Sequence, residues 1–263
     1  MLGGSCICYY LERCIMKVFS VIGITDSGKT TTIEHIIKEL KKRNYSVGTV
    51  KHIHFHGFKM DAEGTNTDRH KKAGSLLVTA RGEYETDILF QEKLSINEIL
   101  NFYNHDFVIL EGARDTCAPK IVTAHDEEAI EERLDETTFA ISGRIADTIN
   151  EYKGLPAISA VKDIEKLVDL IEEKVFDRLP DMKDECCKKC GHTCKELCSL
   201  ILKGNAERGD CILDEQKVVL KINGKEIKMV PFVQKILLNS VEAIVKELEG
   251  YNENGDIEIC IKK

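Results

Sequence analysis

The stretch 18–32 places the strongest constraint on what this chain can fold into. It has the pattern of a buried β-strand, then a loop bounded by glycines, then the first turn of a helix. Gly23, Gly28, Lys29 and Thr30 match G-x-x-x-x-G-K-[ST] without exception. In such a loop the backbone N–H groups surround phosphate oxygens, and the helix N-terminus faces their negative charge. The sequence therefore predicts a nucleotide-phosphate site, or P-loop.

Individual roles follow from the pattern. We expect Lys29 to reach the β- and γ-phosphate oxygens and the Thr30 hydroxyl to complete a Mg²⁺ shell. Asp26 suits a turn and is expected to shape the loop. The residues expected to contact the nucleotide are Gly23, Thr25, Asp26, Ser27, Gly28, Lys29, Thr30 and Thr31. The alternative is a chance strand–turn–helix, which the matching flanks argue against.

A P-loop also needs an acidic residue at the end of a neighbouring strand, where it can meet Mg²⁺ or its water. Glu111 directly follows the apolar run 107–110 and is the best-placed candidate. A carboxylate buried at a strand end is costly unless a cation or hydrogen bonds offset the lost hydration. We therefore predict that Glu111 works with Lys29 in catalysis. The alternative is an exposed glutamate at a strand end.

From residue 17 to about 180, apolar runs alternate with helical patterns, which predicts an α/β fold with a mostly parallel sheet. After the first strand, we expect strands at 46–51, 75–80, 86–91, 107–110, 120–123, 138–141 and 157–159. We expect helices at 29–43, at 96–103 with Ser95 as its N-cap, and from Asp163 to 179. The stretch 52–72 shows no clear periodicity.

Four segments are predicted along the chain. Residues 1–16 are expected to be a non-structural extension, with Met16 as the true start; a metal site at Cys6, Cys8 and Cys14 is the alternative. Residues 17–180 form the P-loop domain, and 181–214 form a small cysteine-rich module. Residues 215–263 form a tail with a β-hairpin turning at Asn223-Gly224, a helix, and a strand at 256–261.

Charge and hydropathy exclude other classes of protein. A net charge of −8 over 263 residues argues against broad nucleic-acid binding, which requires a basic surface. No apolar run approaches the roughly 18 residues of a membrane span. Glu12 and Arg13 interrupt the first apolar stretch, so it does not resemble a signal peptide. We expect a cytoplasmic protein with no membrane partner.

A histidine-rich stretch follows the second expected strand. His52, His54 and His56 alternate, so on a strand they would share one face, and imidazoles suit Zn²⁺ or Ni²⁺. However, the stretch lies at the carboxyl end of its strand, where open α/β sheets bind their ligands. We favour substrate or phosphate contact; a solvated loop and a metal site are the alternatives.

Six of the 11 cysteines lie between residues 186 and 211. The spacing Cys187-x2-Cys190-x3-Cys194-x16-Cys211 suits a [4Fe–4S] cluster, with Cys₄-ligated Zn²⁺ as the alternative. A further alternative is a set of structural or disulfide cysteines, because positions 186, 190, 194 and 198 also follow a helical i, i+4 spacing. Cys117 and Cys260 are isolated and are expected to be ordinary small buried residues.

Several motifs along residues 16–179 resemble the MobB family. They are the P-loop, Val47-Gly-Thr-Val-Lys-His52, His56-Gly-Phe, Asp61, Gly64, Arg69-His70, Ala73-Gly74, Leu110-Glu-Gly112 and Ile141-Ser-Gly-Arg144. The resemblance implies a dimeric P-loop fold that binds GTP, hydrolyses it weakly, and works beside the guanylyltransferase that joins GMP to molybdopterin. By position, Gly28, Lys29, Thr30, Asp61, Arg69 and Glu111 correspond to nucleotide or magnesium contacts.

The resemblance has two departures. Asn66 stands where the family often has an acidic residue, and no Asn-Lys-x-Asp guanine signature is present. GTP therefore rests on the resemblance alone. The cysteine segment is similar to the iron–sulfur domains of Rnf-type electron carriers and of the corrinoid iron–sulfur protein. Those domains usually have one more residue between the second and third cysteines.

These patterns together predict a GTP-binding, weakly hydrolysing adapter in molybdenum or tungsten cofactor biosynthesis that also carries a [4Fe–4S] module. Its expected partners are a molybdopterin guanylyltransferase and a second copy of the chain. Molybdopterin, or a molybdo- or tungstoenzyme, is a further possible partner. Hydrolysis is expected to be slow because no catalytic base stands out. The alternative function is an iron–sulfur electron-transfer or cluster-carrier protein switched by nucleotide.

Overall fold

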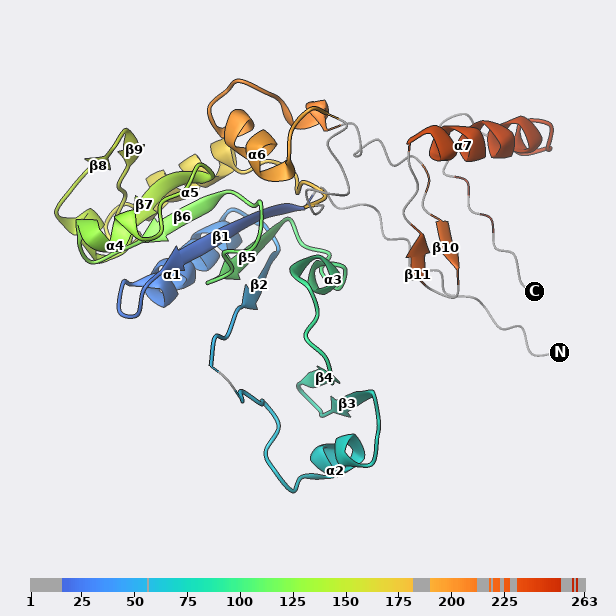
Figure 1. Cartoon of the computed structure of the whole chain (residues 1–263), viewed down its shortest axis with the longest axis horizontal. Helices are drawn as coiled ribbons and strands as arrows, with labels where there is room; N and C mark the ends of the chain where they lie inside the picture. The colour runs from blue at the N-terminus through green and yellow to red at the C-terminus, as the bar shows by residue number, and fades with distance from the viewer. Residues whose placement is uncertain are drawn as a thin grey trace.

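The fold is built around one parallel sheet of five strands. The computed structural model describes residues 16–55, 57–181, 190–211, 218, 220–222, 225–227, 231–251, 257 and 259. The strands run in the order β2-β5-β1-β6-β7, and every pairing between neighbours is parallel (Figure 1). Their bounds are β1 (Lys17–Gly23), β2 (Val47–Lys51), β5 (Phe107–Glu111), β6 (Lys120–Thr123) and β7 (Thr138–Ser142). The predicted α/β fold is confirmed.

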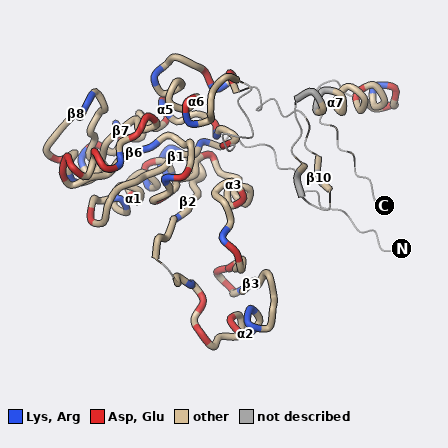
Figure 2. The backbone as a smooth tube through the Cα atoms, viewed as in Figure 1, with Lys and Arg blue, Asp and Glu red and all other residues tan. Residues whose placement is uncertain are grey.

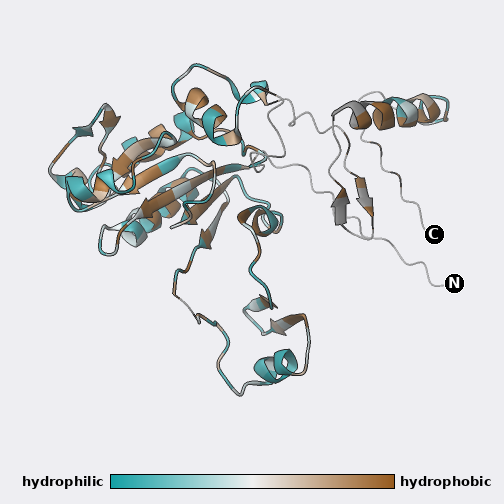
Figure 3. Ribbon diagram, in the orientation of Figure 1, coloured by the Kyte–Doolittle hydropathy of each residue, from teal (hydrophilic) through white to brown (hydrophobic). Residues whose placement is uncertain are grey.

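Alternate side chains of the strands enter two different cores. Phe107 and Ile109 face α1 (Lys29–Lys42) and α5 (Ile164–Lys174), whereas Val108 and Leu110 face the side covered by α3 (Ile96–Leu100). This is the two-residue period of a β-strand buried on both faces. Each fully buried side chain of this size contributes about 1.5–3 kcal/mol to folding. The central strands are accordingly strongly hydrophobic in Figure 3.

A third core lies beside the β7 edge of the sheet. It contains Ala129 and Ile130 from α4 (Glu127–Glu131) and Ile145 from the 3₁₀ helix η1 (Arg144–Asp147). The short strands β8 (Glu151–Tyr152) and β9 (Leu155–Pro156) follow. The strand expected at 157–159 is wrong, because only one parallel bridge, from Ile141 to Ala157, forms there. The sequence patterns did not predict α4.

Residues after β2 leave the sheet as an arm and return at α3. The arm carries α2 (Asn66–Lys72) and an antiparallel hairpin of β3 (Leu77–Arg81) with β4 (Thr86–Phe90). Figure 1 shows this arm well away from the parallel sheet, and Figure 3 shows α2 as strongly hydrophilic. The two hairpin strands were predicted, but they pair outside the main sheet. The helix within the aperiodic stretch was not predicted.

Two predicted helices end early. The helix after Asp163 stops at Lys174, because the next residues pair with the start of β1: Asp177 bridges Lys17, and the Arg178 N–H donates to the Met16 carbonyl at 3.0 Å. Within the described residues, Asp163 makes no capping hydrogen bond through its side chain, so that prediction is wrong. The helix after Ser95 stops at residue 100, although Ser95 does form the expected capping box.

The cysteine segment contributes α6 (Cys194–Leu202) and the 3₁₀ helix η2 (Arg208–Asp210). The tail contains β10 (Leu220–Ile222) paired with β11 (Lys225–Ile227), and then α7 (Pro231–Val245), as expected. Residues 1–15, the Asn223-Gly224 turn, and most of the last predicted strand lie outside the described residues. Among the described helices, none is long and apolar enough to span a bilayer.

Candidate functional site

The predicted phosphate loop joins β1 to α1 in the required conformation. Asp26 and Gly28 are left-handed, with φ of 58° and 93°, so the chain turns sharply between strand and helix. Gly28 is the N-cap of α1, and no described side chain caps the N–H groups that follow it. These uncapped N–H groups, at the positive end of the helix dipole, form an anion site.

Gly23 lies so close to β6 that a side chain does not fit. A Cβ at Gly23 would be 2.3 Å from both the carbonyl oxygen and the hydroxyl of Thr123. The Ser27 hydroxyl donates to the Ile24 carbonyl at 2.8 Å and lies 2.9 Å from the Thr123 hydroxyl. The Ser27 side chain is fully buried in these contacts. The Ser27 hydroxyl is therefore already bonded within the protein, and only the Ser27 backbone N–H is available for a phosphate.

Gly143 packs against the backbone of the P-loop. A Cβ there would lie 2.2 Å from the Ser27 carbonyl oxygen, and the Arg144 N–H donates to that same oxygen at 3.3 Å. Gly28, in the loop, is close to the same glycine: a Cβ added at Gly28 would lie 3.3 Å from the Gly143 Cα. The motif Ile141-Ser-Gly-Arg144 thus packs directly against the P-loop. The sequence contained the motif but gave no physical role for it.

Lys29 and Glu111 lie close enough at the carboxyl edge of the sheet for their charges to interact. The Lys29 ammonium donates to the carbonyls of Gly23, at 2.9 Å, and Ile24. Burial lowers the pKa of Lys29, and the negative charge of Glu111 opposes that shift. Glu111 is 16% exposed and its carboxylate is 3.0 Å from the ammonium of Lys51, at the end of β2. The structure therefore brings together the two residues predicted to be catalytic.

Further positive charges surround this pair. Lys51, Arg133 and Arg114 all act on Lys29 as like charges and lower its pKa further. They come from the end of β2, the segment after α4, and the segment after β5. Together they create a positive field suited to a polyphosphate. None was predicted as a site residue: Lys51 stood within a quoted motif, but Arg114 and Arg133 carried no pattern that would have identified them.

Magnesium is the metal that the P-loop implies. Thr30 lies exposed in the first turn of α1, and Glu111 lies on the same edge of the sheet. In the described part of the chain, no three His, Cys, Asp or Glu side chains are grouped to hold a metal ion. Mg²⁺ at a nucleotide takes most of its ligands from phosphates and water, and one or two from the protein. A hydroxyl and a carboxylate on the phosphate side are a donor set that fits.

His52 and His54 lie beside Glu111-Gly112. Their rings stack with centroids 4.4 Å apart, and the His52 N–H donates to the Glu111 carbonyl at 2.9 Å. The Cβ position of Gly112 is 3.9 Å from the His54 Nε2 atom. The favoured interpretation of this stretch, a contact with substrate or phosphate, stays a prediction. His56, the third histidine of the alternative metal site, lies outside the described residues.

Asp61 and Arg69 belong to the arm rather than to the sheet. The Asp61 carboxylate accepts from the hydroxyls of Thr65 at 2.7 Å and Thr67 at 2.9 Å, and pairs with Lys71 at 2.7 Å. Thr65 is the N-cap of α2, and Figure 1 shows α2 far from the P-loop end of α1. The structure therefore does not place these two predicted nucleotide contacts beside Lys29: the Asp61 carboxylate is bound by Thr65, Thr67 and Lys71, and Arg69 lies exposed within α2.

A pH dependence follows from the Asp61 contacts. The hydrogen bonds from Lys71 and Thr65 lower the pKa of Asp61 from 3.8 to about 2. A carboxyl with a depressed pKa stabilises the fold above pH 4, and that contribution is lost as the pH falls toward 2. We expect the carboxyl carbon of Asp61 to titrate near pH 2 by NMR. A midpoint near 4 would contradict the pairing.

The cysteine segment packs its thiols together. Helix α6 begins with a capping box between Thr193 and Glu196. One apolar cluster contains five cysteines, all of them thiols rather than disulfides: Cys117, Cys190, Cys194, Cys198 and Cys211. Cys198 is fully buried, and burial raises its pKa to about 12, so it is a core residue.

Three of the four predicted cluster ligands are in this group, namely Cys190, Cys194 and Cys211, and Cys187 lies outside the described residues. Among the described residues, however, no three His, Cys, Asp or Glu side chains are grouped closely enough to hold a metal ion, so the described thiols do not by themselves make an iron–sulfur or zinc site. The prediction that Cys117 is a small buried residue is confirmed. Although Cys117 is isolated in the sequence, it packs in one apolar cluster with Leu197 and Cys198 of α6.

Comparisons with known proteins point to one family. The family described as Molybdopterin guanine dinucleotide synthesis protein B, MobB, matches residues 18–143. A protein from Methanocaldococcus jannaschii, named among the molybdopterin-guanine dinucleotide biosynthesis adapter proteins, is 30% identical over 253 residues. That match covers 94% of this chain and 97% of the relative, so it includes the cysteine segment and the tail.

Two matches from Bacillus subtilis cover a little over half of this chain. A similarly named adapter protein is 28% identical over 148 residues, covering 54% of this chain and 85% of the relative. The crystal structure of Bacillus subtilis MobB is 26% identical and superposes with a TM-score of 0.51, covering 60% of this chain and 98% of that one. The fold is thus that of a MobB-like P-loop protein followed by additional segments.

Proposed function

This chain belongs to the MobB family, and we propose that it binds GTP at the P-loop as an adapter in molybdopterin-guanine dinucleotide biosynthesis. The observation that carries the proposal is the meeting of Lys29, Glu111 and Lys51 at the carboxyl edge of the sheet, beside the uncapped start of α1. These are the parts that a triphosphate with Mg²⁺ requires. The choice of GTP over ATP is inherited from the family.

Each residue has a task in that proposal. The loop N–H groups and the Lys29 ammonium neutralise phosphate charge, and Lys51, Arg114 and Arg133 extend the positive field around them. Thr30 and Glu111 would hold Mg²⁺, and the ion, when bound, would neutralise part of the phosphate charge. No side chain described here is placed as an obvious base for the attacking water. Hydrolysis is therefore proposed to be slow and secondary to binding.

The role of Glu111 has a measurable consequence. Glu111→Gln keeps the size of the side chain but removes the charge that would face Mg²⁺. We expect the Mg²⁺ concentration needed for half-maximal GTP binding to rise about tenfold, which is about 1.4 kcal/mol. Glu34→Gln, an exposed glutamate on α1, is the control and is expected to leave that concentration unchanged. Equal Mg²⁺ requirements for both variants would contradict the assignment.

We also propose that the cysteine module, set within 181–214, holds a [4Fe–4S] cluster through Cys187, Cys190, Cys194 and Cys211. The proposal is supported by the spacing and by the shared location of three of these thiols. The test is anaerobic purification followed by analysis of iron, zinc and acid-labile sulfide. About four irons and four sulfides per chain are expected for this type of cluster. One zinc per chain without sulfide would overturn it.

The adapter role is tested with its proposed partner. A molybdopterin guanylyltransferase would be incubated with molybdopterin, GTP and Mg²⁺, with and without this chain, and the dinucleotide product measured. We expect the chain to increase the yield, and the Lys29→Ala variant to give no increase. An equal yield with and without the chain would contradict the proposal. Sedimentation of the same preparation tests the homodimer, which is a further part of the proposal.

A second candidate function is a cluster carrier or electron-transfer protein switched by nucleotide. One observation favours it: the segment that starts at Glu111 in the phosphate site continues to Cys117 in the cysteine cluster. This function requires that GTP change the reduction potential of the cluster. An identical potential with and without GTP would exclude it and leave the adapter proposal standing.

A further inference from the structure

Arg144, just after the end of β7, lies against the P-loop but has no role in the phosphate site described above. Its backbone N–H donates to the Ser27 carbonyl at 3.3 Å, and a Cβ added at Gly28 would lie 3.6 Å from the Arg144 nitrogen. The Arg144 side chain is exposed and, among the residues that the structure describes, has no ion-pair partner. A guanidinium group therefore starts beside the nucleotide loop with its N–H donors available for a ligand.

The backbone on both sides of Arg144 is held in place by hydrogen bonds. The Ser142 hydroxyl donates to the Ile158 carbonyl at 2.7 Å, and the Ile145 N–H donates to the Ala124 carbonyl at 2.9 Å. Ile145 is also buried. Because its neighbours are fixed, Arg144 has a defined position relative to the P-loop, as a residue that determines ligand specificity requires.

The residues assigned to the phosphate site determine which way a bound nucleotide would run. Glu111 ends β5 and its ion-pair partner Lys51 ends β2, so the proposed magnesium and terminal-phosphate end lies on that side of β1. Arg144 follows β7, which lies on the opposite side of β1 in the strand order. A nucleotide with its terminal phosphate beside Glu111 would therefore extend its base along the carboxyl edge toward β6 and β7.

The surroundings of Arg144 favour an uncharged group over a further phosphate. Ala129 of α4 packs in the same core as Ile145, the residue after Arg144. Helix α4 begins with the exposed carboxylates of Glu127 and Glu128 (red in Figure 2). Carboxylates repel a phosphate, whereas a purine base is uncharged. The charge pattern around Arg144 is therefore suited to the base of the nucleotide.

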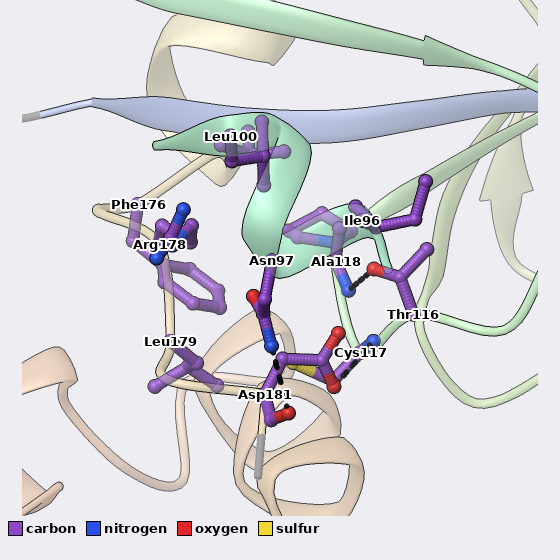
Figure 4. Close-up of a pocket in the computed structure, with 12 residues that line it drawn as sticks. Ile96, Asn97, Leu100, Thr116, Cys117, Ala118, Phe176, Arg178, Leu179 and Asp181 are labelled. Carbon is purple, nitrogen blue, oxygen red and sulfur yellow. Dashed lines mark hydrogen bonds between the residues drawn. The ribbon is translucent and has the colours of Figure 1, made fainter. Parts of the chain in front are cut away.

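The pocket shown in Figure 4 is not an alternative place for the base. It is lined by Val18 at the start of β1, whereas the P-loop follows Gly23 at the other end of that strand, about 16 Å away at roughly 3.3 Å per residue. In the pocket, the Asn97 amide donates to the Asp181 carbonyl at 3.1 Å, and the Cys117 N–H donates to the Asp181 carboxylate at 3.3 Å. These polar groups are thus bonded within the protein.

We propose that Arg144 selects guanine, donating two hydrogen bonds from its guanidinium group to the O6 and N7 atoms of the base. This inference rests on the proposed binding of GTP at the P-loop. Arginine carries only donors, so it matches the two acceptors of guanine, whereas adenine has an N6 amino donor in the place of O6. The preference for GTP then has a physical basis in a chain without an Asn-Lys-x-Asp signature.

Two variants and a control separate recognition of the base from an effect of charge. Arg144→Ala removes both the charge and the donors, and Arg144→Lys keeps the charge but not the planar pair of donors. Arg81→Ala makes the same charge change as Arg144→Ala at an exposed position on the arm. Each full chain would be titrated calorimetrically with GTP, ATP and inorganic tripolyphosphate in the presence of Mg²⁺. Tripolyphosphate measures binding to the phosphate loop alone, because it has no base.

We expect Arg144→Ala to bind GTP about tenfold more weakly, with its affinities for ATP and tripolyphosphate within about twofold of the wild type. Arg144→Lys is expected to lose most of the preference for GTP, and Arg81→Ala to keep it. An equal loss for GTP and tripolyphosphate in Arg144→Ala would overturn the inference, because Arg144 would then be a phosphate contact. A wild-type preference for GTP in Arg144→Ala would overturn the inference alone and leave the proposed GTP binding standing.

Base analogues test which atoms of the base are contacted. Inosine triphosphate keeps O6 and N7 but lacks the N2 amino group, so the wild-type chain should bind it as tightly as GTP. The 7-deaza analogue of GTP lacks the N7 acceptor and should bind more weakly. The opposite order would overturn the inference, because an acceptor in the protein would then contact the N2 amino group. Equal wild-type affinities for GTP and ATP would overturn the proposed GTP binding and this inference together.

Discussion

Replacing Lys29 by alanine is expected to lower the affinity for GTP by about 10- to 100-fold. The Lys29 ammonium lies within the loop, in hydrogen-bond contact with the carbonyls of Gly23 and Ile24. It is the charge that the P-loop motif assigns to the β- and γ-phosphates. A hydrogen bond to a charged group contributes about 1.5–3 kcal/mol, and each 1.4 kcal/mol is a factor of ten in affinity. Isothermal titration with GTP and Mg²⁺ measures the loss.

The control for this experiment is Lys38→Ala. Lys38 is an exposed lysine on the same helix, so its removal changes the net charge by the same amount while leaving the loop intact. Its GTP affinity is expected to remain within about twofold of the wild type, because an exposed distant charge is largely screened by salt. Equal affinities for Lys29→Ala and Lys38→Ala would contradict a nucleotide site at this loop.

Gly143→Ala is expected to destabilise the fold by about 2–5 kcal/mol and to weaken GTP binding in the protein that remains folded. Gly143 has a φ of 81°, and a Cβ there would lie 2.2 Å from the Ser27 carbonyl and 3.0 Å from the Ala124 nitrogen. Left-handed strain costs about 1–2 kcal/mol, and displacing backbone adds about 1–3 kcal/mol. Because Ser27 belongs to the P-loop, the displacement would also deform the anion site. Urea unfolding measures the first effect.

Gly154→Ala separates strain from steric displacement. Gly154 has nearly the same φ, 80°, but its Cβ position has no described atom within 4 Å. We expect this variant to lose only about 1–2 kcal/mol and to bind GTP normally. Similar losses for the two variants would show that Gly143 does not support the loop in the way that its contacts indicate.

The sequence was sufficient wherever the signal is local. The P-loop, the apolar strands and the helix after Gly28 were predicted because hydrophobic period, glycine and lysine spacing act within a few residues. Glu111 was also predicted, since a carboxylate after a buried strand has few explanations. These residues define the centre of the site.

The residues that pack around these site residues could not be predicted from one sequence. Gly143 contacts Ser27 across more than a hundred residues, and Arg133 approaches Lys29 from another strand connection. Contacts of this kind depend on strand order, which local pattern does not determine. Asp61 shows another limit: its motif predicts a nucleotide contact, which stays a prediction, and only the structure shows that its carboxylate pairs with Thr65 and Lys71 in the arm.

Cys117 shows the same limit for the cysteine segment. A single cysteine followed by alanine and proline has no ligand spacing, so sequence alone assigns it to the core. Its packing against Leu197 and Cys198 of α6 becomes visible only in the tertiary structure, which brings the connection between β5 and β6 to that helix.

The central claim, that this MobB-family chain is a GTP-binding adapter, is tested most directly by titrating the anaerobically purified protein with GTP and with ATP in the presence of Mg²⁺. We expect saturable binding of GTP that is at least about tenfold tighter than that of ATP, a difference of about 1.4 kcal/mol. ATP binding as tightly as GTP, or binding of neither nucleotide, would contradict it.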